Sequence, residues 1–187
     1  MAKKKQNSST AYSTSLKVWA VVRIMIGLIM LWAFADKMLG LGFSTCRSTD
    51  TKTKVETVQV LCEKSVAKGA SPTVGFLKFA AKGPMKSFYN NLAGKHWVDF
   101  MFMAALLLGG LALVSGVGVR IASVGSILLL VMMWSVVLPV AQNPVLDDHL
   151  VYAVALLGVM ATNADQVWGL GKWWQKQAVV KKYPILQ

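Results

Sequence analysis

Long apolar runs separated by polar segments dominate the pattern of this chain. Residues 100–119, 121–146 and 150–164 contain no Asp, Glu, Lys or Arg. Apolar stretches of about 20 residues are typical of helices that cross a membrane. The pattern therefore predicts four spans, at residues 17–39, 97–117, 120–141 and 147–168.

The fold class predicted from this pattern is an all-α membrane protein, a four-transmembrane-helix bundle with a long exterior loop carrying short amphipathic helices. We expect a disordered basic N-terminus over residues 1–15, one membrane domain over residues 16–174 and a basic C-terminal tail over residues 175–187. The exterior loop covers residues 42–96. The alternation of Thr and Val from Thr51 to Val60 favours a strand or hairpin within it.

The second half of the loop predicts two short helices. Ser71 and Pro72 form an N-cap and N1 pair. Apolar residues then follow at helical spacing, and a second short amphipathic stretch comes after Gly83 and Pro84. We expect these helices to lie on the membrane surface or to cover the mouth of the bundle. Their apolar positions are Phe76, Leu77, Phe79 and Ala80, then Met85, Phe88, Tyr89 and Leu92.

Composition and charge agree with a membrane protein. The chain is 55% hydrophobic and only 15% charged, against roughly 25% charged in an average soluble domain. Its net charge of +12 comes from Lys and Arg at span ends, as in cytoplasmic flanks that face anionic membrane lipid. No nucleic-acid motif is present, so nucleic acid is not an expected partner.

The orientation follows from the positive-inside rule. An even number of spans places both termini on one side. Lys and Arg are equally frequent on the two sides, but long loops weigh less in the rule, and the turn over residues 142–149 has neither residue. We therefore expect a multi-pass protein with cytoplasmic N- and C-termini and an exterior loop.

The two cysteines, Cys46 and Cys62, both lie in the exterior loop, where an oxidising environment would let them pair. A disulfide between them would close a loop of about 17 residues, worth roughly 3 kcal/mol in a chain-entropy account. Two unpaired thiols and a redox-active pair remain as alternatives. Neither cysteine has a metal-ligand spacing.

Ionisable groups within spans are costly, so each one is a hypothesis about function. Arg23 lies about two turns inside the first span, near its cytoplasmic end. Asp165 lies at the cytoplasmic end of the fourth span. Their similar depth predicts that Arg23 and Asp165 form a structural pair. In the alternative, Arg23 extends to lipid phosphates and Asp165 is solvated.

Polar residues also collect at the exterior ends of all four predicted spans and predict a polar ring over an apolar bundle. Arg23 and Lys37 fall within about 40° of each other around the first helix, which gives that span one polar stripe. The members of the ring are Asp36, Lys37, His96, Asp99, Gln142, Asn143, Asp147, Asp148 and His149.

Three interpretations fit the ring. A quinone head group needs donors near its carbonyl oxygens, a proton-exchanging carboxylate or His, and an apolar slot for its tail. A metal is less suited, because Asp147 and Asp148 point about 100° apart on a helix and chelate poorly; no metal is predicted. In the third interpretation the polar residues are only helix caps: Asn143 stands before Pro144, and Asp147 stands before the last apolar run.

The quinone hypothesis assigns roles to individual residues, with quinone as the cofactor. Asp36, Asp148 and His149 would be the catalytic, proton-exchanging groups. The ligand-binding residues would be Arg23, Lys37, His96, Asp99 and Asn143.

Several segments, in this order, resemble the DoxX/DoxD family of small four-helix membrane proteins. "VRIMIGLIMLWAFADKM" is an Arg-led first span that ends in Asp and Lys. "LLLGGLALVSGVGVRIAS" is a glycine-rich second span, and "NPVLDDHLVYAVALLG" precedes "WGLGKWW". The resemblance covers about residues 16–174. "SPTVGFLKFAAKGP" is similar to the extended first loop of the DoxD-like branch.

The resemblance implies a four-helix bundle in a prokaryotic plasma membrane. The DoxD branch is similar to the membrane subunit of thiosulfate:quinone oxidoreductase, which oxidises thiosulfate to tetrathionate, reduces quinone and works with a second subunit, DoxA. It thus implies a redox-associated membrane subunit with a soluble or membrane redox partner, and assigns no catalytic residue. Whether the chain is itself an enzyme stays open.

Two other functions fit the same sequence. One is a non-catalytic membrane scaffold that docks a soluble redox protein through loop 42–96. The other is a small-molecule transporter, which four helices would form only as a homo-oligomer.

Overall fold

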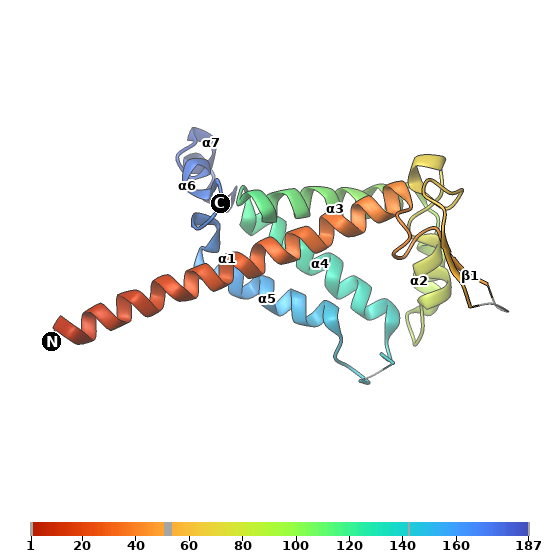
Figure 1. Ribbon diagram of the computed structural model, residues 1–187, viewed down its shortest axis with the longest axis horizontal. Helices are drawn as coiled ribbons and strands as arrows, with labels where there is room; N and C mark the ends of the chain where they lie inside the picture. The colour runs from red at the N-terminus through yellow and green to blue at the C-terminus, as the bar shows by residue number, and fades with distance from the viewer. Residues whose placement is uncertain (1, 51–53, 142, 187) are drawn as a thin grey trace. The chain divides into compact units, whose positions relative to one another are not determined.

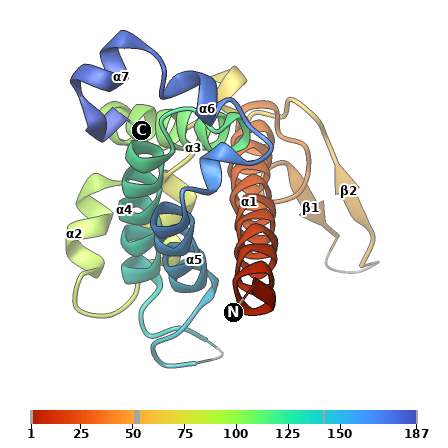
Figure 2. The ribbon, with the colours of Figure 1, turned by 90° about the vertical axis from the view of Figure 1, so that its left-hand side faces the viewer.

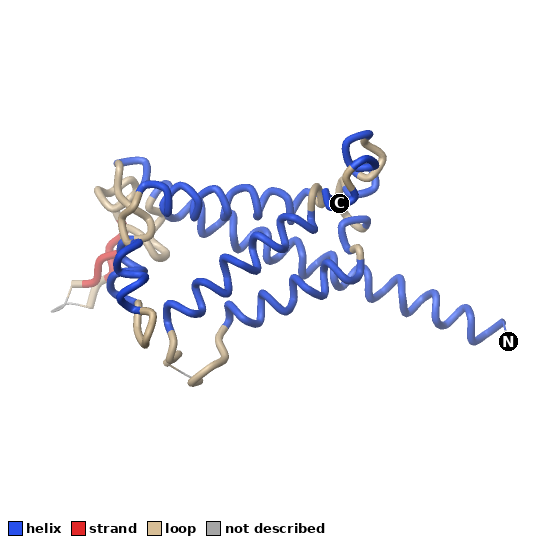
Figure 3. Tube along the Cα trace, turned by 180° about the vertical axis from the view of Figure 1, so that it is seen from behind, coloured by secondary structure: helices blue, strands red, loops and turns tan. Residues whose placement is uncertain are grey.

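The structure, a computed structural model, describes residues 2–50, 54–141 and 143–186, with side chains in the first helix from Thr14 onward. Helices make up most of the described chain (Figures 1 and 3). Gln142 of the predicted ring lies outside the described residues, as does Thr51 at the start of the predicted strand.

The chain divides into two compact units. Unit 1 comprises Met1–Ile29, Leu108–Val131 and Asp148–Gln187, and unit 2 comprises Met30–Leu107 and Met132–Asp147. This division cuts across the single membrane domain predicted over residues 16–174. The long helices α1 (Ala2–Leu39), α3 (His96–Ser115) and α4 (Val119–Val137) contribute residues to both units.

Three helical segments are long and apolar enough to cross a membrane, and they indicate a multi-pass membrane protein. They are Thr14–Leu39, His96–Ser115 and Val119–Val137. In a bilayer a backbone must satisfy its hydrogen bonds internally, which favours helix for each of these runs. Large apolar side chains such as Trp32, Leu108 and Leu128 are exposed on them, as expected where lipid replaces water.

The helix of the predicted fourth span is shorter than predicted. Helix α5 (Asp148–Thr162) has 15 residues and rises about 22 Å, less than the roughly 30 Å of a hydrocarbon core. It ends where Asn163 adopts a left-handed conformation, with φ 51°. Helix α4 likewise ends before residue 141, because Pro139 disfavours helix at the preceding residue.

The N-terminal segment differs from its prediction. Residues 1–15 are predicted to be disordered, yet α1 begins at Ala2. No Gly or Pro occurs before Gly27. A helix nucleated by the span can extend without a new nucleation step, although the Ser- and Thr-rich residues 7–15 are poor helix formers.

The loop contains a β-hairpin, as the alternation of Thr and Val favoured, within a fold that is mostly helical. Strand β1 (Arg47–Thr49) pairs antiparallel with β2 (Glu56–Val58), with Ser48 opposite Thr57. The predicted alternation covers only the second strand. The hydroxyls of Ser48 and Thr57 are hydrogen-bonded at 2.8 Å, a cross-strand pair of the kind that stabilises short ladders.

The two short helices predicted in the loop are present. A single turn, η1 (Val66–Lys68), comes first, followed by the π-helical turn η2 (Phe76–Ala80) and helix α2 (Lys86–Leu92). The Ser71 hydroxyl accepts a hydrogen bond from the Val74 backbone N–H at 3.2 Å, as the predicted cap requires. Of these elements, η2 and α2 pack around one core in unit 2, formed by Leu77, Ala81, Tyr89 and Val136.

The C-terminal segment is folded rather than a simple tail. After η3 (Ala164–Gln166) come α6 (Gly171–Trp174), α7 (Ala178–Lys182) and η4 (Pro184–Leu186). Val180 is fully buried. The Trp174 indole N–H donates to the Leu186 carbonyl at 2.6 Å, so the last residues fold back onto α6.

Close helix packing in unit 1 depends on glycine. Helices α1 and α5 lie side by side (Figure 2). Gly158 of α5 faces the Trp19 ring of α1, and Gly27 of α1 lies against α3. A Cβ on Gly27 would lie 3.0 Å from the Gly110 carbonyl oxygen and 2.8 Å from a Val114 methyl carbon. Small residues let membrane helices approach closely.

We therefore expect Gly27→Ala to destabilise the protein by about 1–3 kcal/mol through overpacking. Gly125→Ala is the matched control, because a Cβ on this helical glycine would have no neighbour within 4 Å. The control should be neutral or slightly stabilising. The measurement is unfolding of the purified variants by a denaturing detergent, and equal effects of the two changes would contradict this packing.

Candidate functional site

Arg23 is the largest fully buried side chain of the described residues. In unit 1, all the hydrogen bonds of its guanidinium to described residues go to backbone carbonyls. Nη1 donates to the carbonyls of Leu113 and of Val114, the latter at 3.2 Å. Nη2 donates to the carbonyls of Val167 at 3.1 Å and Trp168 at 3.0 Å.

These bonds fix the end of a helix. The last carbonyls of an α-helix have no partner within the helix, and α3 ends at Ser115. A cation there satisfies the carbonyls and suits the negative end of the helix dipole. Arg23 thus fastens α1 to the end of α3 and to the turn after η3. The described hydrogen bonds of Arg23 Nη1 and Nη2 all go to protein backbone, while the buried Nε has no hydrogen-bond partner among the described residues.

Two glycines make room for the guanidinium. A Cβ on Gly116 would lie 3.2 Å from Arg23 Nη1, and a Cβ on Gly169 would lie 3.1 Å from Nη2. Gly116 also has φ +79°, which side chains rarely adopt. Gly116 of "SGVGVR" and Gly169 of "WGLGKWW" therefore belong to the same cluster as Arg23.

Asp165 lies in this cluster without a direct ion pair to Arg23. It is buried in η3, and its Oδ2 accepts a hydrogen bond from Gln175 Nε2 at 3.0 Å. Among the described residues no nitrogen of Arg23 lies within 4.0 Å of an Asp165 carboxylate oxygen, although the two charges interact. The charges of Arg23 and Asp165 therefore interact without the direct ion pair that a structural pair would form. The sequence did not suggest Gln175 as its partner.

Asp165 lies beyond the end of α5, and burial raises the pKa of its carboxyl above the ordinary value of about 3.9. Its own backbone hydrogen bond, the Arg23 charge, Gln175 and Arg120 oppose that rise. Because the folded pKa is raised, the folded state binds more protons than the unfolded state in this pH range. Stability from this group is therefore full below the unfolded pKa and falls as pH rises through the folded pKa.

We expect Asp165→Asn to remove the fall in folding stability that the Asp165 carboxyl causes as the pH rises. Thermal unfolding of the detergent-purified protein, measured from pH 4 to pH 7, should show a weaker decline for the variant than for the wild type. Glu63→Gln is the control, because Glu63 is exposed in the loop after the hairpin, and it should keep the wild-type slope. An unchanged slope for Asp165→Asn would show that this carboxyl is not the titrating group.

Asp36 organises the loop that follows α1 in unit 2. Its carboxylate is fully buried. Oδ1 accepts the Phe43 backbone N–H at 2.9 Å, and Oδ2 accepts the Ser44 backbone N–H at 3.0 Å and the Ser44 hydroxyl at 2.7 Å. Charge-assisted bonds of this kind are about twice as strong as neutral ones. These hydrogen bonds fix the loop. They also occupy the Asp36 carboxylate, to which the quinone hypothesis assigned proton exchange.

Lys37 and Asp99 also have protein partners in unit 2. Lys37 Nζ lies 5.9 Å from the centre of the Phe102 ring, within cation–π range. Asp99 Oδ1 accepts the hydroxyls of Ser71 at 2.8 Å and Thr73 at 2.6 Å. The sequence did not suggest these two hydroxyls. They join the loop to the first turn of α3.

Asn143 and His96 are two further predicted members in unit 2. Asn143 Oδ1 accepts the backbone N–H groups of Val145 at 2.9 Å and Leu146 at 2.8 Å. This is capping geometry, but the residues after Asn143 form a bend and α5 begins only at Asp148. The cap therefore closes a turn instead of starting a helix. His96 is exposed at the first residue of α3.

Asp148 and His149 begin α5 and belong to unit 1. His149 Nδ1 lies 3.5 Å from an Asp148 carboxylate oxygen, with side chains 19% and 70% exposed respectively. The other ring members with described positions belong to unit 2. A ring that joins all four helix ends therefore stays a prediction.

The consecutive residues Asp147, Asp148 and His149 offer one ligand atom each within 4.8 Å of one another. Water can complete a set of three protein ligands, as it does in catalytic zinc sites, but exposed acidic groups of this kind are common without an ion. The absence of a metal therefore stays a prediction.

Cys46 and Cys62 form a disulfide, with their Cα atoms 5.8 Å apart. The Gln59 backbone N–H also donates to the Cys46 carbonyl at 3.2 Å. The bridge therefore closes the hairpin at its base. This structure contains the bridged form of the pair.

Comparisons with protein-family models, with curated proteins and with solved structures find no match to the chain. The resemblance to the DoxX/DoxD family therefore stays a prediction.

Proposed function

We propose that this chain is a membrane-embedded platform without catalysis of its own, which presents loop 42–96 to a soluble redox protein. The observation that carries the proposal is the use of its buried ionisable groups. Arg23 bonds to helix-end carbonyls, Asp36 to loop backbone, and Asp99 to loop hydroxyls. Groups held in this way stabilise a scaffold better than they exchange protons.

The loop has the properties of a docking platform. Its hairpin is closed by the disulfide, and Arg47 of β1 forms an ion pair of 3.4 Å with Glu56 of β2. Val55, Val58 and Val60 remain about half exposed on or beside β2. Exposed apolar side chains on a fixed segment are typical of protein-binding surfaces.

The proposal includes a four-span bundle in a prokaryotic plasma membrane, with α5 as the fourth span and cytoplasmic termini. Local thinning of the bilayer accommodates a short span at modest cost. Trp168 and Trp173 are exposed after α5, near Lys172 and Lys176. Aromatic and basic residues of this kind support an interfacial, cytoplasmic position.

Site-specific photo-crosslinking in intact cells tests the platform. A photoreactive residue at Val58 should capture a protein that carries a redox cofactor, identified by mass spectrometry. The same residue at Lys176 is the control for the opposite face and should not capture it. Replacing Val55 and Val60 with Ser should abolish capture while the disulfide stays intact. Equal capture from both faces, or capture without a redox protein, would contradict the proposal.

A second candidate is a redox-associated subunit of DoxX/DoxD type that binds quinone and takes part in thiosulfate:quinone oxidoreduction with a partner. The observation in its favour is the acid–imidazole pair of Asp148 and His149, which is suited to proton transfer. Thiosulfate-dependent quinone reduction by the protein with its partner should then fall in Asp148→Asn and His149→Ala. Unchanged rates in both variants would reject this candidate. No described contact favours a transporter.

A further inference from the structure

A basic surface lies on the second half of the loop in unit 2. Residues 64–98 contain several Lys but no Asp or Glu. Three of these lysines, Lys78, Lys82 and Lys86, are exposed on η2, on α2 and between them. The segment has no acidic side chain to neutralise the positive charge of these lysines.

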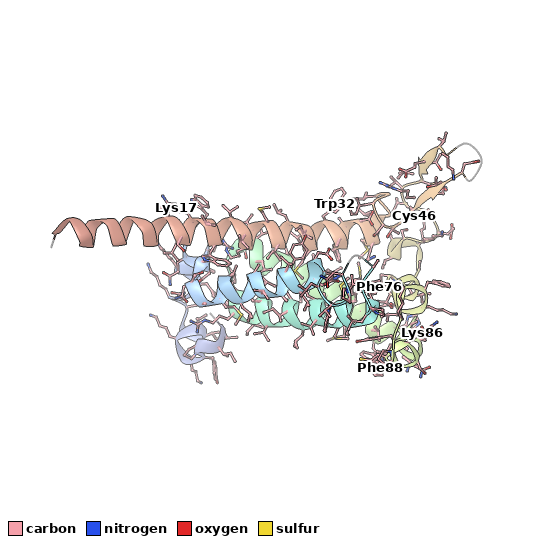
Figure 4. The ribbon with its side chains drawn as sticks, turned by 90° about the horizontal axis from the view of Figure 1, so that it is seen from below. Lys17, Trp32, Cys46, Phe76, Lys86 and Phe88 are labelled. Carbon is pink, nitrogen blue, oxygen red and sulfur yellow. A yellow bond between two sulfur atoms is a disulfide. The ribbon has the colours of Figure 1, made fainter. Side chains whose placement is uncertain are left out.

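Large apolar side chains are exposed among these lysines. Phe79 is 78% exposed, Phe88 is 53% exposed and Met85 is 44% exposed. Figure 4 shows Phe88 and Lys86 projecting from the same helix. We call the set of Lys78, Phe79, Lys82, Met85, Lys86 and Phe88 the Lys–Phe patch.

The patch is fixed to the end of a membrane-length helix. The Lys82 backbone N–H donates to the Val136 carbonyl at 3.0 Å. The Tyr89 and Ser135 hydroxyls are hydrogen-bonded, and Tyr89 is buried. Ser135 and Val136 are in the last turn of α4, which ends at Val137. The patch is therefore held where a span leaves the hydrocarbon.

We infer that the Lys–Phe patch lies on the membrane surface and binds the head groups of anionic phospholipids in the leaflet at that end of α4. Aromatic rings prefer the interface between hydrocarbon and water. Lysines beside them extend toward phosphates and are attracted by anionic lipid. Lipid fits better than a protein partner because the patch is anchored to the end of a span and carries no acidic side chain to select one.

Spin-label accessibility in nanodiscs tests this site in the full chain. Phe79→Cys and Phe88→Cys are labelled without reductant, so that Cys46 and Cys62 stay in their disulfide. Asn90→Cys is the matched control, because Asn90 is exposed on the opposite flank of α2 from Phe88. Collisions with oxygen report lipid, and collisions with a nickel chelate report water. Nanodiscs contain either phosphatidylglycerol or phosphatidylcholine.

Labels at positions 79 and 88 should collide more with oxygen and less with nickel than the label at 90. This shift should be larger in phosphatidylglycerol. The triple change Lys78→Gln, Lys82→Gln and Lys86→Gln should reduce it to the phosphatidylcholine level. The control change Lys54→Gln, Lys64→Gln and Lys68→Gln removes the same charge outside the patch and should not.

Three results would overturn the inference. Water exposure at 79 and 88 in both lipids would show that the patch is not on the membrane. Protection from both reagents would indicate a protein contact, such as a second copy of the chain. An equal shift in both lipids would exclude recognition of anionic head groups. An intact disulfide and a single elution peak confirm that each variant is folded.

Discussion

Arg23→Met is expected to lower the free energy of unfolding by about 3–5 kcal/mol, the scale of breaking a buried, charged hydrogen-bond network. Methionine fills similar volume but donates no hydrogen bond. The carbonyls of Val114, Val167 and Trp168 would lose the donors that Arg23 supplies, and buried acceptors without partners are costly. Detergent-induced unfolding of the purified protein measures the loss.

Two variants separate this role from a general effect of charge. Arg23→Lys keeps the charge but cannot spread donors over several carbonyls, so it should recover less than half of the stability. Arg120→Met removes a similar side chain from the surface, where Arg120 has a 3.4 Å bond to Asn163. It should cost less than about 1 kcal/mol. Equal losses for Arg23→Met and Arg120→Met would contradict the role of Arg23.

Removal of the Cys46–Cys62 disulfide is expected to have the second large effect. The cysteines are 16 residues apart in sequence, and closing a loop of about this length is worth roughly 3 kcal/mol in a chain-entropy account. Without the bridge, residues 46–62 should become sensitive to proteases added outside the membrane. Unfolding curves and limited proteolysis of Cys46→Ser measure the two effects.

The disulfide variants contain their own control. Cys46→Ser, Cys62→Ser and the double variant each remove the same bridge, so the double variant should lose no more stability than either single variant. A reductant should lower the stability of the wild type to that of the variants. Additive losses, or a wild type that does not respond to the reductant, would contradict a stabilising bridge.

The long spans could be predicted because their signal is local. A run without charge that is long enough to cross a bilayer has few alternatives to helix. The boundaries depended on single residues: Pro139 ends α4 early, and Asn163 ends α5 early. The length of α5 could not be predicted, because a left-handed Asn is not marked by composition.

The partners of the polar residues could not be predicted from the sequence. Arg23 bonds to backbone carbonyls. Because every residue has a backbone carbonyl, the sequence does not indicate which of them Arg23 contacts. Asp36 and Asp99 were predicted at span ends, but the loop that brings Ser44, Ser71 and Thr73 to them is set by tertiary structure. The same side chains suit a ligand site or a scaffold, and only geometry distinguishes the two.

A platform and a quinone site differ most directly in what stays bound to the protein. Native mass spectrometry of the full chain, extracted gently from its membrane, measures this. A platform should carry phospholipid but no stoichiometric quinone, and His149→Ala should give the same spectrum as the wild type. A quinone bound at one per chain in the wild type and lost from His149→Ala would show instead that the chain is a quinone site.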